Sequence, residues 1–415
     1  MTTAAICRTP PPPSPDELIA RARALVPEIR ARAEETERNR TISPAIIAKV
    51  REAELLRTTR PKEFGGFEHD AVVALEIALT ISAACASTGW AVNGALSNGI
   101  SFGHYPIETQ RELWGDGTDP FSCACFAPTG AAVPAEGGYV LNGKWSFASG
   151  VDHSSWIRLG AFIKSPDRAQ SPGAEFGAGA QSGDGAFFLL PTSEVEIVDN
   201  WFVYGLCGTG SKNVIVQDAF VPEHRVLRFA DTRAGRTAGA QHHKNPLYRL
   251  PLLVLGASML ASTAVGAAKG AVADYQEMTT GRTTRGALAG GGLAMAEFAT
   301  VQLRYAEAAA AAEAAELILM TDMRAAMAKL RAGDDITVGD RIRARRNQAY
   351  ATRLALQAVE ALNASTGGAG LQLSNPIQRA WRDVNAVARH VSLNWDAVGT
   401  MYGQHAFGLE PRGQY

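Results

Sequence analysis

The last third of the chain contains two long alanine-rich stretches, and they restrict the fold more than any other feature. Residues 305–329 and 338–363 are rich in alanine and carry few charges. Alanine has the highest helix propensity, and its small side chain lets helices approach closely. We therefore predict that these stretches are helices of a C-terminal bundle, buried on more than one side, within residues 246–415. Because so much Ala and Leu surface would be costly to expose on one chain, we also expect a homo-oligomer.

Two regions of different character precede this bundle. Residues 14–118 have helical periodicity and begin with the cap-like sequence Ser14-Pro15-Asp16-Glu17, so we predict an N-terminal helical domain. Residues 119–227 contain short β-rich runs separated by Gly and Pro, which predicts a central β domain, a small barrel or sandwich. Asn142-Gly143 predicts a hairpin turn inside the first run. Residues 165–184 are rich in Gly, Ala, Ser and Gln and predict a surface loop, whose role as a lid stays open. The fold class is mainly α with a central β domain (α+β).

Composition excludes several classes of protein. The 415 residues carry a formal net charge of −1, which gives no electrostatic case for binding nucleic acid or an anionic membrane. We expect no membrane-spanning segment and no secretory signal. The five cysteines are odd in number and dispersed, which favours reduced thiols in a cytoplasmic protein. Cys123-x-Cys125 lacks a second ligand pair, and His242-His243 lacks identifiable partners, so we predict no metal site.

Several motifs recur in a fixed order along the chain, and the most distinctive lie near the C-terminus. In chain order they are Pro61-Lys-Glu-Phe-Gly-Gly66, Phe126-Ala-Pro-Thr-Gly130, Gly143-Lys-Trp-Ser-Phe-Ala-Ser-Gly150, Gly205-Leu-Cys-Gly-Thr-Gly-Ser211, Thr366-Gly-Gly-Ala-Gly370, Pro376-Ile-Gln-Arg-Ala-Trp-Arg-Asp383 and His390. Together they resemble the acyl-CoA dehydrogenase superfamily over about residues 15 to 410. The resemblance implies an N-terminal helical domain, a middle β-barrel and a C-terminal four-helix bundle.

One departure from the dehydrogenase pattern indicates a different chemistry. In the dehydrogenases a base carboxylate usually follows the Arg-Asp pair, but residues 384–391 contain no carboxylate. His390 stands beside the expected place, on the helix expected after Arg382-Asp383. This resembles the two-component, reduced-flavin-dependent aromatic monooxygenases of the superfamily. The implied function is an oxygenase component that uses reduced FMN or FAD and O2. It would hydroxylate a phenolic or indolic small molecule through a C4a-hydroperoxyflavin. The chain has no nicotinamide-binding fingerprint, so a separate NAD(P)H:flavin reductase would supply the flavin, and the family implies a homotetramer.

The resemblance also implies roles for individual residues. Ser149 is the expected hydrogen-bond donor near flavin N5, and His390 is expected to accept a phenolic proton or to hydrogen-bond at the reacting centre. The remaining expected cofactor contacts are Phe126, Trp145 and Phe147 at the flavin ring and Arg282, Gly367 and Gly368 at its phosphates; the expected substrate pocket comprises Asn93, Asn98, Trp201 and His390. Taken singly, each has a plainer interpretation: a lone histidine is usually structural, and a buried tryptophan or turn serine fits any β domain.

Three alternatives remain open at this point. An acyl-thioester dehydrogenase would need a carboxylate base from an earlier helix and would reduce dyes with acyl-CoA. An N- or S-oxidising reduced-flavin monooxygenase of the same fold is indistinguishable from a ring hydroxylase by sequence. A non-catalytic scaffold protein would tolerate His390→Ala and would not bind reduced flavin.

Overall fold

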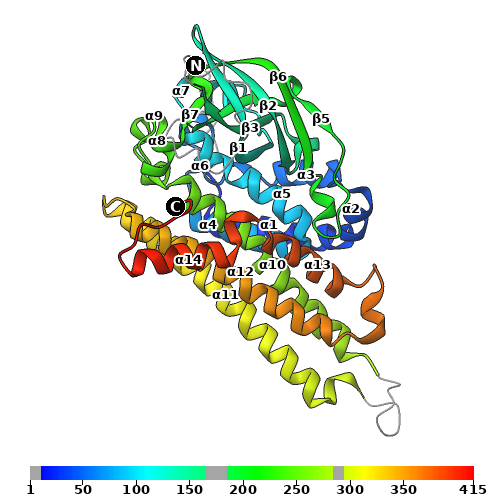
Figure 1. The fold of residues 1–415 in the computed structure, drawn as a ribbon. Helices are drawn as coiled ribbons and strands as arrows, with labels where there is room; N and C mark the ends of the chain where they lie inside the picture. Colours follow the sequence, from blue (N-terminus) through cyan, green and yellow to red (C-terminus); the bar gives the residue numbers. More distant parts are fainter. Residues whose placement is uncertain (1–10, 165–184, 284–293) are drawn as a thin grey trace, which may run out of the picture.

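The computed structural model describes residues 11–164, 185–283 and 294–415. The loop expected at 165–184 lies outside the described residues. Figure 1 shows a β region, a group of N-terminal helices beside it and a long helical bundle that extends away from both. The predicted mainly helical fold with a central β domain is confirmed.

The N-terminal region is a set of short helices with well-defined starts. They are α1 (Pro15–Ala31), α2 (Ala33–Asn39), α3 (Pro44–Glu52), α4 (Ala71–Ala84), α5 (Ala86–Leu96), α6 (Asn98–Gly103) and α7 (Ile107–Trp114). Ser14 and Glu17 form a capping box at the start of α1, as the sequence suggests. Asp70 caps α4 by accepting from the backbone N–H of Val72. These local signals fix where the helices begin, and apolar packing then holds them together.

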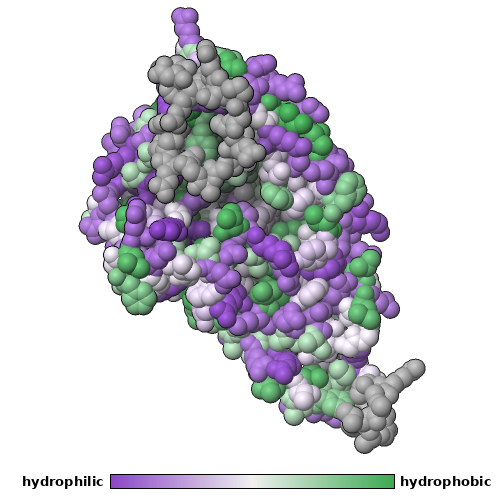
Figure 2. Space-filling model, in the orientation of Figure 1, coloured by the Kyte–Doolittle hydropathy of each residue, from purple (hydrophilic) through white to green (hydrophobic). Residues whose placement is uncertain are grey.

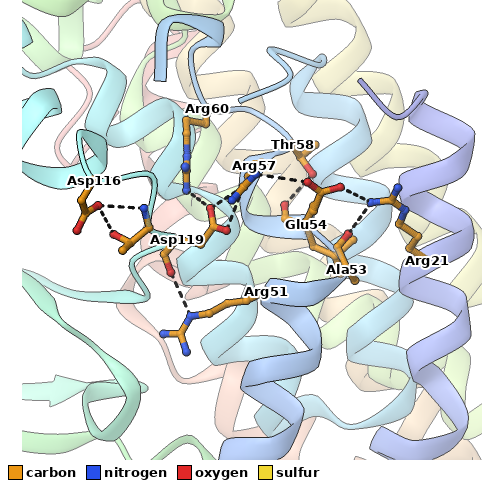
Figure 3. Close-up of polar contacts among 11 residues, drawn as sticks. Arg21, Arg51, Ala53, Glu54, Arg57, Thr58, Arg60, Asp116 and Asp119 are labelled. Carbon is orange, nitrogen blue, oxygen red and sulfur yellow. Dashed lines mark hydrogen bonds and ion pairs between the residues drawn. The ribbon is translucent and has the colours of Figure 1, made fainter. Parts of the chain in front are cut away.

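A buried ion-pair network joins these helices to the first strand. Figure 3 shows Arg57 and Arg60 converging on Asp119, with Arg57 Nε 2.9 Å from the Asp119 carboxylate. Arg51 donates to the Asp119 backbone carbonyl at 3.1 Å. The side chain of Arg60 is only 2% exposed and lies over the Trp114 ring. Because a buried cation needs such partners, the network holds the chain just before the first strand.

The central region is one seven-stranded sheet in the order β5-β6-β2-β1-β3-β4-β7. The strands are β1 (Ser122–Ala135), β2 (Gly138–Ala148), β3 (Trp156–Ile163), β4 (Gly185–Pro191), β5 (Glu196–Val198), β6 (Lys212–Pro222) and β7 (Val226–Arg228). β1 and β3 are parallel, and the other pairings are antiparallel. The strands contribute to an apolar core of their own. This core is distinct from the one that the helices share.

The predicted turn at Asn142-Gly143 is wrong. β2 runs straight through these residues, and the turn that joins it to β1 lies at Glu136-Gly137, where Gly137 has a φ of +76°. Asn142 instead exchanges two hydrogen bonds with Asp218 of β6, at 3.0 and 2.9 Å, beside a register shift. A Cβ on Gly143 would lie 2.7 Å from the Trp145 ring. Close packing therefore explains this glycine, whereas the sequence signal suggested a turn.

The C-terminal region is the predicted bundle. Two short helices, α8 (Phe229–Ala234) and α9 (Ala238–His242), lead into it, and its long helices are α10 (Leu252–Thr280), α11 (Ala299–Arg331), α12 (Val338–Ala364), α13 (Pro376–Ala388) and α14 (Trp395–Ala406). α10 and α12 each pack against α11 and α13 and against each other, and α14 packs on α12. The alanine-rich stretches form α11 and α12, as expected, and α10 also packs against α4 and α5. One apolar core therefore runs through both helical regions.

α10 is long and apolar enough to cross a membrane, but 78% of its most apolar window is buried inside the protein. Its small side chains allow close contacts: a Cβ on Gly270 would lie 2.1 Å from the Ala83 carbonyl of α4. On the face drawn in Figure 2, apolar residues lie in small groups among polar ones. We therefore interpret α10 as the central helix of the protein core.

Candidate active site

Three residues from distant parts of the sequence meet where the sheet joins the helices. Ser149 follows the end of β2, Trp90 lies on α5, and His390 follows α13. Trp90 Nε1 donates to Ser149 Oγ at 2.9 Å. The ring centroids of Trp90 and His390 are 5.7 Å apart in an edge-on arrangement. The structure thus brings both predicted catalytic residues to one tryptophan.

The sequence analysis assigned no role to Trp90. Its only local signal is the Gly89-Trp90 pair, and the reason for that glycine is packing, since a Cβ there would lie 2.2 Å from Ser82 Oγ. Gly89 lets α5 pack closely against α4, and the next residue, Trp90, reaches Ser149 and His390.

Ser149 also belongs to a chain of hydroxyl groups. Its Oγ lies 2.7 Å from Ser211 Oγ, which lies 2.6 Å from Thr209 Oγ1. Thr209 in turn donates to the Leu206 carbonyl at 2.8 Å. Ser211 and Thr209 are buried, whereas Ser149 is partly exposed. The glycine-rich segment 205–211 therefore contacts Ser149 through the Ser211 hydroxyl.

The Arg-Asp pair of α13 holds that segment in place. The buried Asp383 accepts from the backbone N–H of Leu206 at 2.6 Å, and Arg382 donates to the Tyr204 carbonyl at 2.7 Å. Burial is the largest influence on the pKa of Asp383 and raises it to about 6. A Cβ on Gly205 would lie 2.3 Å from the Arg382 carbonyl, so only glycine allows this approach. These two hydrogen bonds hold the segment that contains Thr209 and Ser211 against α13.

His390 was expected on the helix that carries Arg382 and Asp383, but it lies beyond the end of that helix. α13 ends at Ala388, and His390 adopts an extended backbone and caps a short 3-10 helix, η11 (Val391–Leu393). Its Nδ1 accepts from the backbone N–H of Ser392 at 3.1 Å. A ring nitrogen that accepts carries no proton, so in the neutral ring the proton is on Nε2. Capping the turn thereby fixes the tautomer.

The charge of His390 is also set by its surroundings. Burial, together with the nearby Arg345 cation, lowers its pKa from 6.5 to about 4. Arg345 is itself buried and donates to the Gln348 side chain and the Gln414 carbonyl, both at 3.2 Å. At neutral pH, His390 is therefore an uncharged ring with an N–H at Nε2. Of the two expected roles, this geometry favours hydrogen-bond donation over acceptance of a phenolic proton.

The rings of Phe147, two residues before Ser149, and Trp201 meet and form a small apolar shelf. Phe147 is 66% exposed with a φ of +67°, and Trp201 meets it edge-on at 5.9 Å. The indole of Trp201 donates to the Leu206 carbonyl at 3.0 Å. Phe126, which is 40% exposed, packs edge-on against Phe187 at 5.1 Å. A flat apolar ring system would find contact surface here.

Two of the predicted contacts are corrected by the structure. Trp145 is 1% exposed in the core of the sheet and donates to the Gly160 carbonyl at 2.7 Å, so it has no surface for a flavin. Asn93 is also 1% exposed, and its amide donates toward α4 and α10, including Thr263 Oγ1 at 3.0 Å. It joins helices and does not line a substrate pocket. Asn98 is 7% exposed on α6.

The residues expected at the flavin phosphates also lie close together, but they lie near the C-terminal end of α10. Arg282 Nη1 donates to the Thr366 carbonyl at 3.0 Å, immediately before Gly367 and Gly368. Among the described residues, a Cβ on either glycine would meet no atom within 4 Å other than those of its chain neighbours. α10 continues from Thr263, beside Asn93, to its end near Arg282, which at 1.5 Å per residue is about 25 Å. Figure 1 shows this end of α10 far from the sheet.

One further group of ligand-type side chains lies apart from these residues. Glu63, His242 and His243 place their ligand atoms within 4.8 Å of one another. His242 lies 2.9 Å from Glu63, and His243 lies 2.9 Å from Gln110 Oε1. Because each imidazole already has a protein partner, we assign no metal to this group.

The chain matches two family models. They are the acyl-CoA dehydrogenase N-terminal domain, over residues 15–115, and the acyl-CoA dehydrogenase C-terminal domain, over residues 258–395. It is 44% identical over 403 residues to the FADH2-dependent resorcinol hydroxylase, oxygenase component, of Rhizobium sp. (strain MTP-10005), covering 96% of each chain.

Solved structures agree with these matches. The HsaA monooxygenase from M. tuberculosis superposes with a TM-score of 0.87 and 30% identity, covering 97% of this chain and 99% of that one. XiaF from Streptomyces sp., in complex with FADH2 and glycerol, superposes with a TM-score of 0.86 and 29% identity, covering 96% of this chain and 97% of that one.

Proposed function

Because the chain belongs to the flavin-dependent monooxygenases of the acyl-CoA dehydrogenase family, we propose that it hydroxylates a small phenol of the resorcinol type. It works as the oxygenase component of a two-component system and receives reduced flavin from a separate NAD(P)H:flavin reductase. The observation that carries the proposal is the convergence of Ser149 and His390 on Trp90. A relative at 44% identity that is named a resorcinol hydroxylase supports the choice of substrate class.

The described residues fit a flavin. The shelf of Phe147 and Trp201 offers contact to its ring, and Ser149 offers a polar group at the shelf's edge. Arg282 and the open backbone at Gly367 and Gly368 suit its phosphates, because arginine donates in a charged fork and missing side chains let N–H groups approach. When bound, reduced flavin supplies the electrons and the position at which oxygen is activated.

A second copy of the chain completes this site in our proposal. Thr263 of α10 contacts Asn93, three residues after Trp90, and the end of α10 near Arg282 lies about 25 Å further along that helix. Leu371 and Leu373, just after the glycines, are 85% and 70% exposed. Exposed leucines at this end suit an interface in which one copy supplies Arg282 to a flavin whose ring lies in its neighbour. We propose a homotetramer, as is expected for the family, acting in the cytoplasm.

His390 positions the phenol in this scheme. An uncharged imidazole with a proton on Nε2 donates to a phenolic oxygen, and a bound phenolate would be stabilised further by the nearby Arg345 cation. A phenolate oxygen makes its ring electron-rich, and this is what transfer of an electrophilic oxygen to the ring requires. The edge of Trp90 limits how the ring of His390 turns.

The test is turnover under heavy-isotope oxygen gas. The protein, a flavin reductase, NADH, FAD and resorcinol are incubated, and the product is analysed by mass spectrometry. We expect one labelled oxygen atom in a trihydroxybenzene, with His390→Ala nearly inactive and His405→Ala, an exposed histidine on α14, unchanged. Dye reduction with acyl-CoA and no labelled phenol would overturn the proposal in favour of a dehydrogenase. A labelled sulfoxide or N-oxide from thioether or amine substrates, with every phenol inert, would overturn the substrate class.

A further inference from the structure

Three arginine side chains are almost fully buried in the described part of the chain, and Arg158 differs from the other two. Arg60 and Arg345 are 2% and 3% exposed; Arg60 pairs with Asp119, and Arg345 donates to two oxygen atoms. Arg158, on β3, is 3% exposed, and its Nε and Nη1 meet no hydrogen-bond acceptor among the described residues. Because a guanidinium keeps its charge, burying it without a partner is costly. The acceptor for these N–H groups is therefore expected from a bound molecule.

Aromatic side chains surround this guanidinium, and one of them is a tyrosine in the same condition. The guanidinium carbon of Arg158 lies 5.1 Å from the centre of the Phe126 ring and 5.3 Å from that of Phe187. Tyr105 belongs to the same buried cluster as Phe187, is 0% exposed, and its hydroxyl also has no partner among the described residues. Burial raises the pKa of Tyr105, so its hydroxyl keeps a hydrogen to donate at neutral pH. These donors together complement an oxygen atom that accepts hydrogen bonds, most favourably a negatively charged one.

The first strand connects Arg158 to the candidate active site. The glycine that follows Ser149 would place a Cβ 3.1 Å from the Phe121 ring, just before β1. Arg158 is opposite Ala124 in the pairing of β1 with β3, three residues after Phe121, or about 10 Å along the strand at 3.3 Å per residue. Phe126, whose ring lies against the guanidinium, is 40% exposed. Movement of this one ring would therefore expose Arg158 to a molecule bound beside Ser149.

We propose that Arg158 and Tyr105 form a second polar subsite of the substrate pocket, which binds a further oxygen substituent on the phenol ring. The proposal rests on the proposed function, in which His390 holds the first oxygen. A phenol with one oxygen leaves the Arg158 cation without a partner, whereas a phenol with two supplies one. Arg158 and Tyr105 are then specificity-determining residues. The second oxygen is the other hydroxyl of resorcinol, bound as an acceptor or a phenolate, or the carboxylate of a hydroxybenzoate.

Binding of three phenols to the full-length protein tests this inference. Resorcinol, 3-hydroxybenzoate and 3-methylphenol, in which a methyl group replaces the second oxygen, are titrated anaerobically by calorimetry with reduced FAD present. We expect the wild-type protein to bind resorcinol or 3-hydroxybenzoate more tightly than 3-methylphenol. Arg158→Met should reduce that preference by roughly tenfold to a hundredfold and leave 3-methylphenol unchanged, because only the charged hydrogen bonds are lost. Tyr105→Phe should reduce it by roughly fivefold. The phenol whose affinity falls more in Arg158→Met identifies the group that the subsite binds.

The matched control is Arg225→Met, which should leave the preference unchanged. Arg225 also lies over an aromatic ring, that of Trp156 at 5.2 Å, but it pairs with Glu112 at 2.6 Å. Thermal unfolding shows whether each variant is folded; Arg158→Met should be, because an apolar side chain replaces a buried cation that has no partner. If it is not, Tyr105→Phe carries the test.

Two results would overturn the inference. One is a wild-type protein with no preference among the three phenols. The other is an Arg158→Met protein that keeps the wild-type preference or binds all three phenols more weakly by the same factor, because a structural role alone does that. If the preference depends on Arg158 but no phenol is hydroxylated, the proposed function fails and the subsite stands. If resorcinol is hydroxylated but its binding is the same in both proteins, the subsite fails and the proposed function stands.

Discussion

The two ends of the proposed flavin site are built in different ways. At the ring end, Trp90, Ser149 and His390 come from three distant segments, and Trp90 and His390 each make a hydrogen bond of defined direction. At the phosphate end, Arg282 and Gly367 lie at the ends of adjacent helices, on open backbone that a second copy would complete. In the proposed function, the chemistry therefore belongs to the ring end, and the phosphate end contributes affinity for the cofactor.

The largest expected effect is at the ring end. His390→Ala removes the donor at Nε2 and should lower the rate of product formation by about a hundredfold to a thousandfold, as the loss of one fixed donor usually does. His390→Gln, which keeps an N–H donor and has no base, should recover much of that rate. Single-turnover product yields at saturating reduced FAD measure both. Equal loss in the Ala and Gln variants would indicate that His390 acts as a base.

A smaller effect is expected at the phosphate end. Arg282→Ala should weaken the binding of reduced and oxidised FAD by the same factor, about tenfold to a hundredfold, because both redox states carry the same phosphates. Arg304→Ala is the matched control, since Arg304 lies near the start of α11 and pairs with Glu307 on the surface. Calorimetry supplies both constants. A change in the ratio of the two affinities would show that the two ends are not independent.

The sequence indicated candidate residues at both ends of the flavin site, but it did not indicate the contacts between them. Ser149 and His390 were predicted because they stand in motifs that resemble the family's. The contacts of Trp90 with both were missed, because contacts between residues as far apart as Trp90 and Ser149 leave no local pattern. The predicted turn at Asn142-Gly143 was wrong for the converse reason. A strong local signal there was outweighed by packing between strands.

The local sequence also did not show which of the expected site residues are buried. Trp145 was expected at the flavin ring and Asn93 in the substrate pocket, but both are 1% exposed and lie in packed cores. His390 was expected on a helix because the family resemblance places it on the helix after Arg382-Asp383. The helix in fact ends at Ala388, and His390 caps the following turn. The domain limits near residues 118, 227 and 246 remain predictions.

A third prediction concerns pH. The pKa of His390 is lowered from 6.5 to about 4 in the folded protein, so protonation favours the unfolded chain. This contribution to stability is present above pH 6.5 and is lost as the pH falls through that value toward 4. Relative to His390→Gln, the wild-type protein should therefore lose about 2 kcal/mol over this window. Urea unfolding of both proteins at several pH values measures the difference, and parallel curves would refute the assignment.

The smallest expected effect sharpens the role of the shelf. Trp201→Phe removes one hydrogen bond to the Leu206 carbonyl and keeps an aromatic ring. This should cost about 1 kcal/mol of flavin affinity, or roughly fivefold. Trp381→Phe is the control, because its indole donates to Glu360 on the bundle. If Trp201→Phe lowered flavin affinity as much as Arg282→Ala does, Trp201 would have a more direct role in binding flavin than apolar contact with its ring.

The most direct test of the central claim is a single turnover of the wild-type protein. Protein saturated anaerobically with reduced FAD and resorcinol is mixed with oxygenated buffer, and hydroxylated product and hydrogen peroxide are both quantified per flavin oxidised. The account predicts that hydroxylated product accounts for most of the oxidised flavin, with little peroxide. Peroxide matching the oxidised flavin, with no hydroxylated product from resorcinol or related phenols, would contradict it.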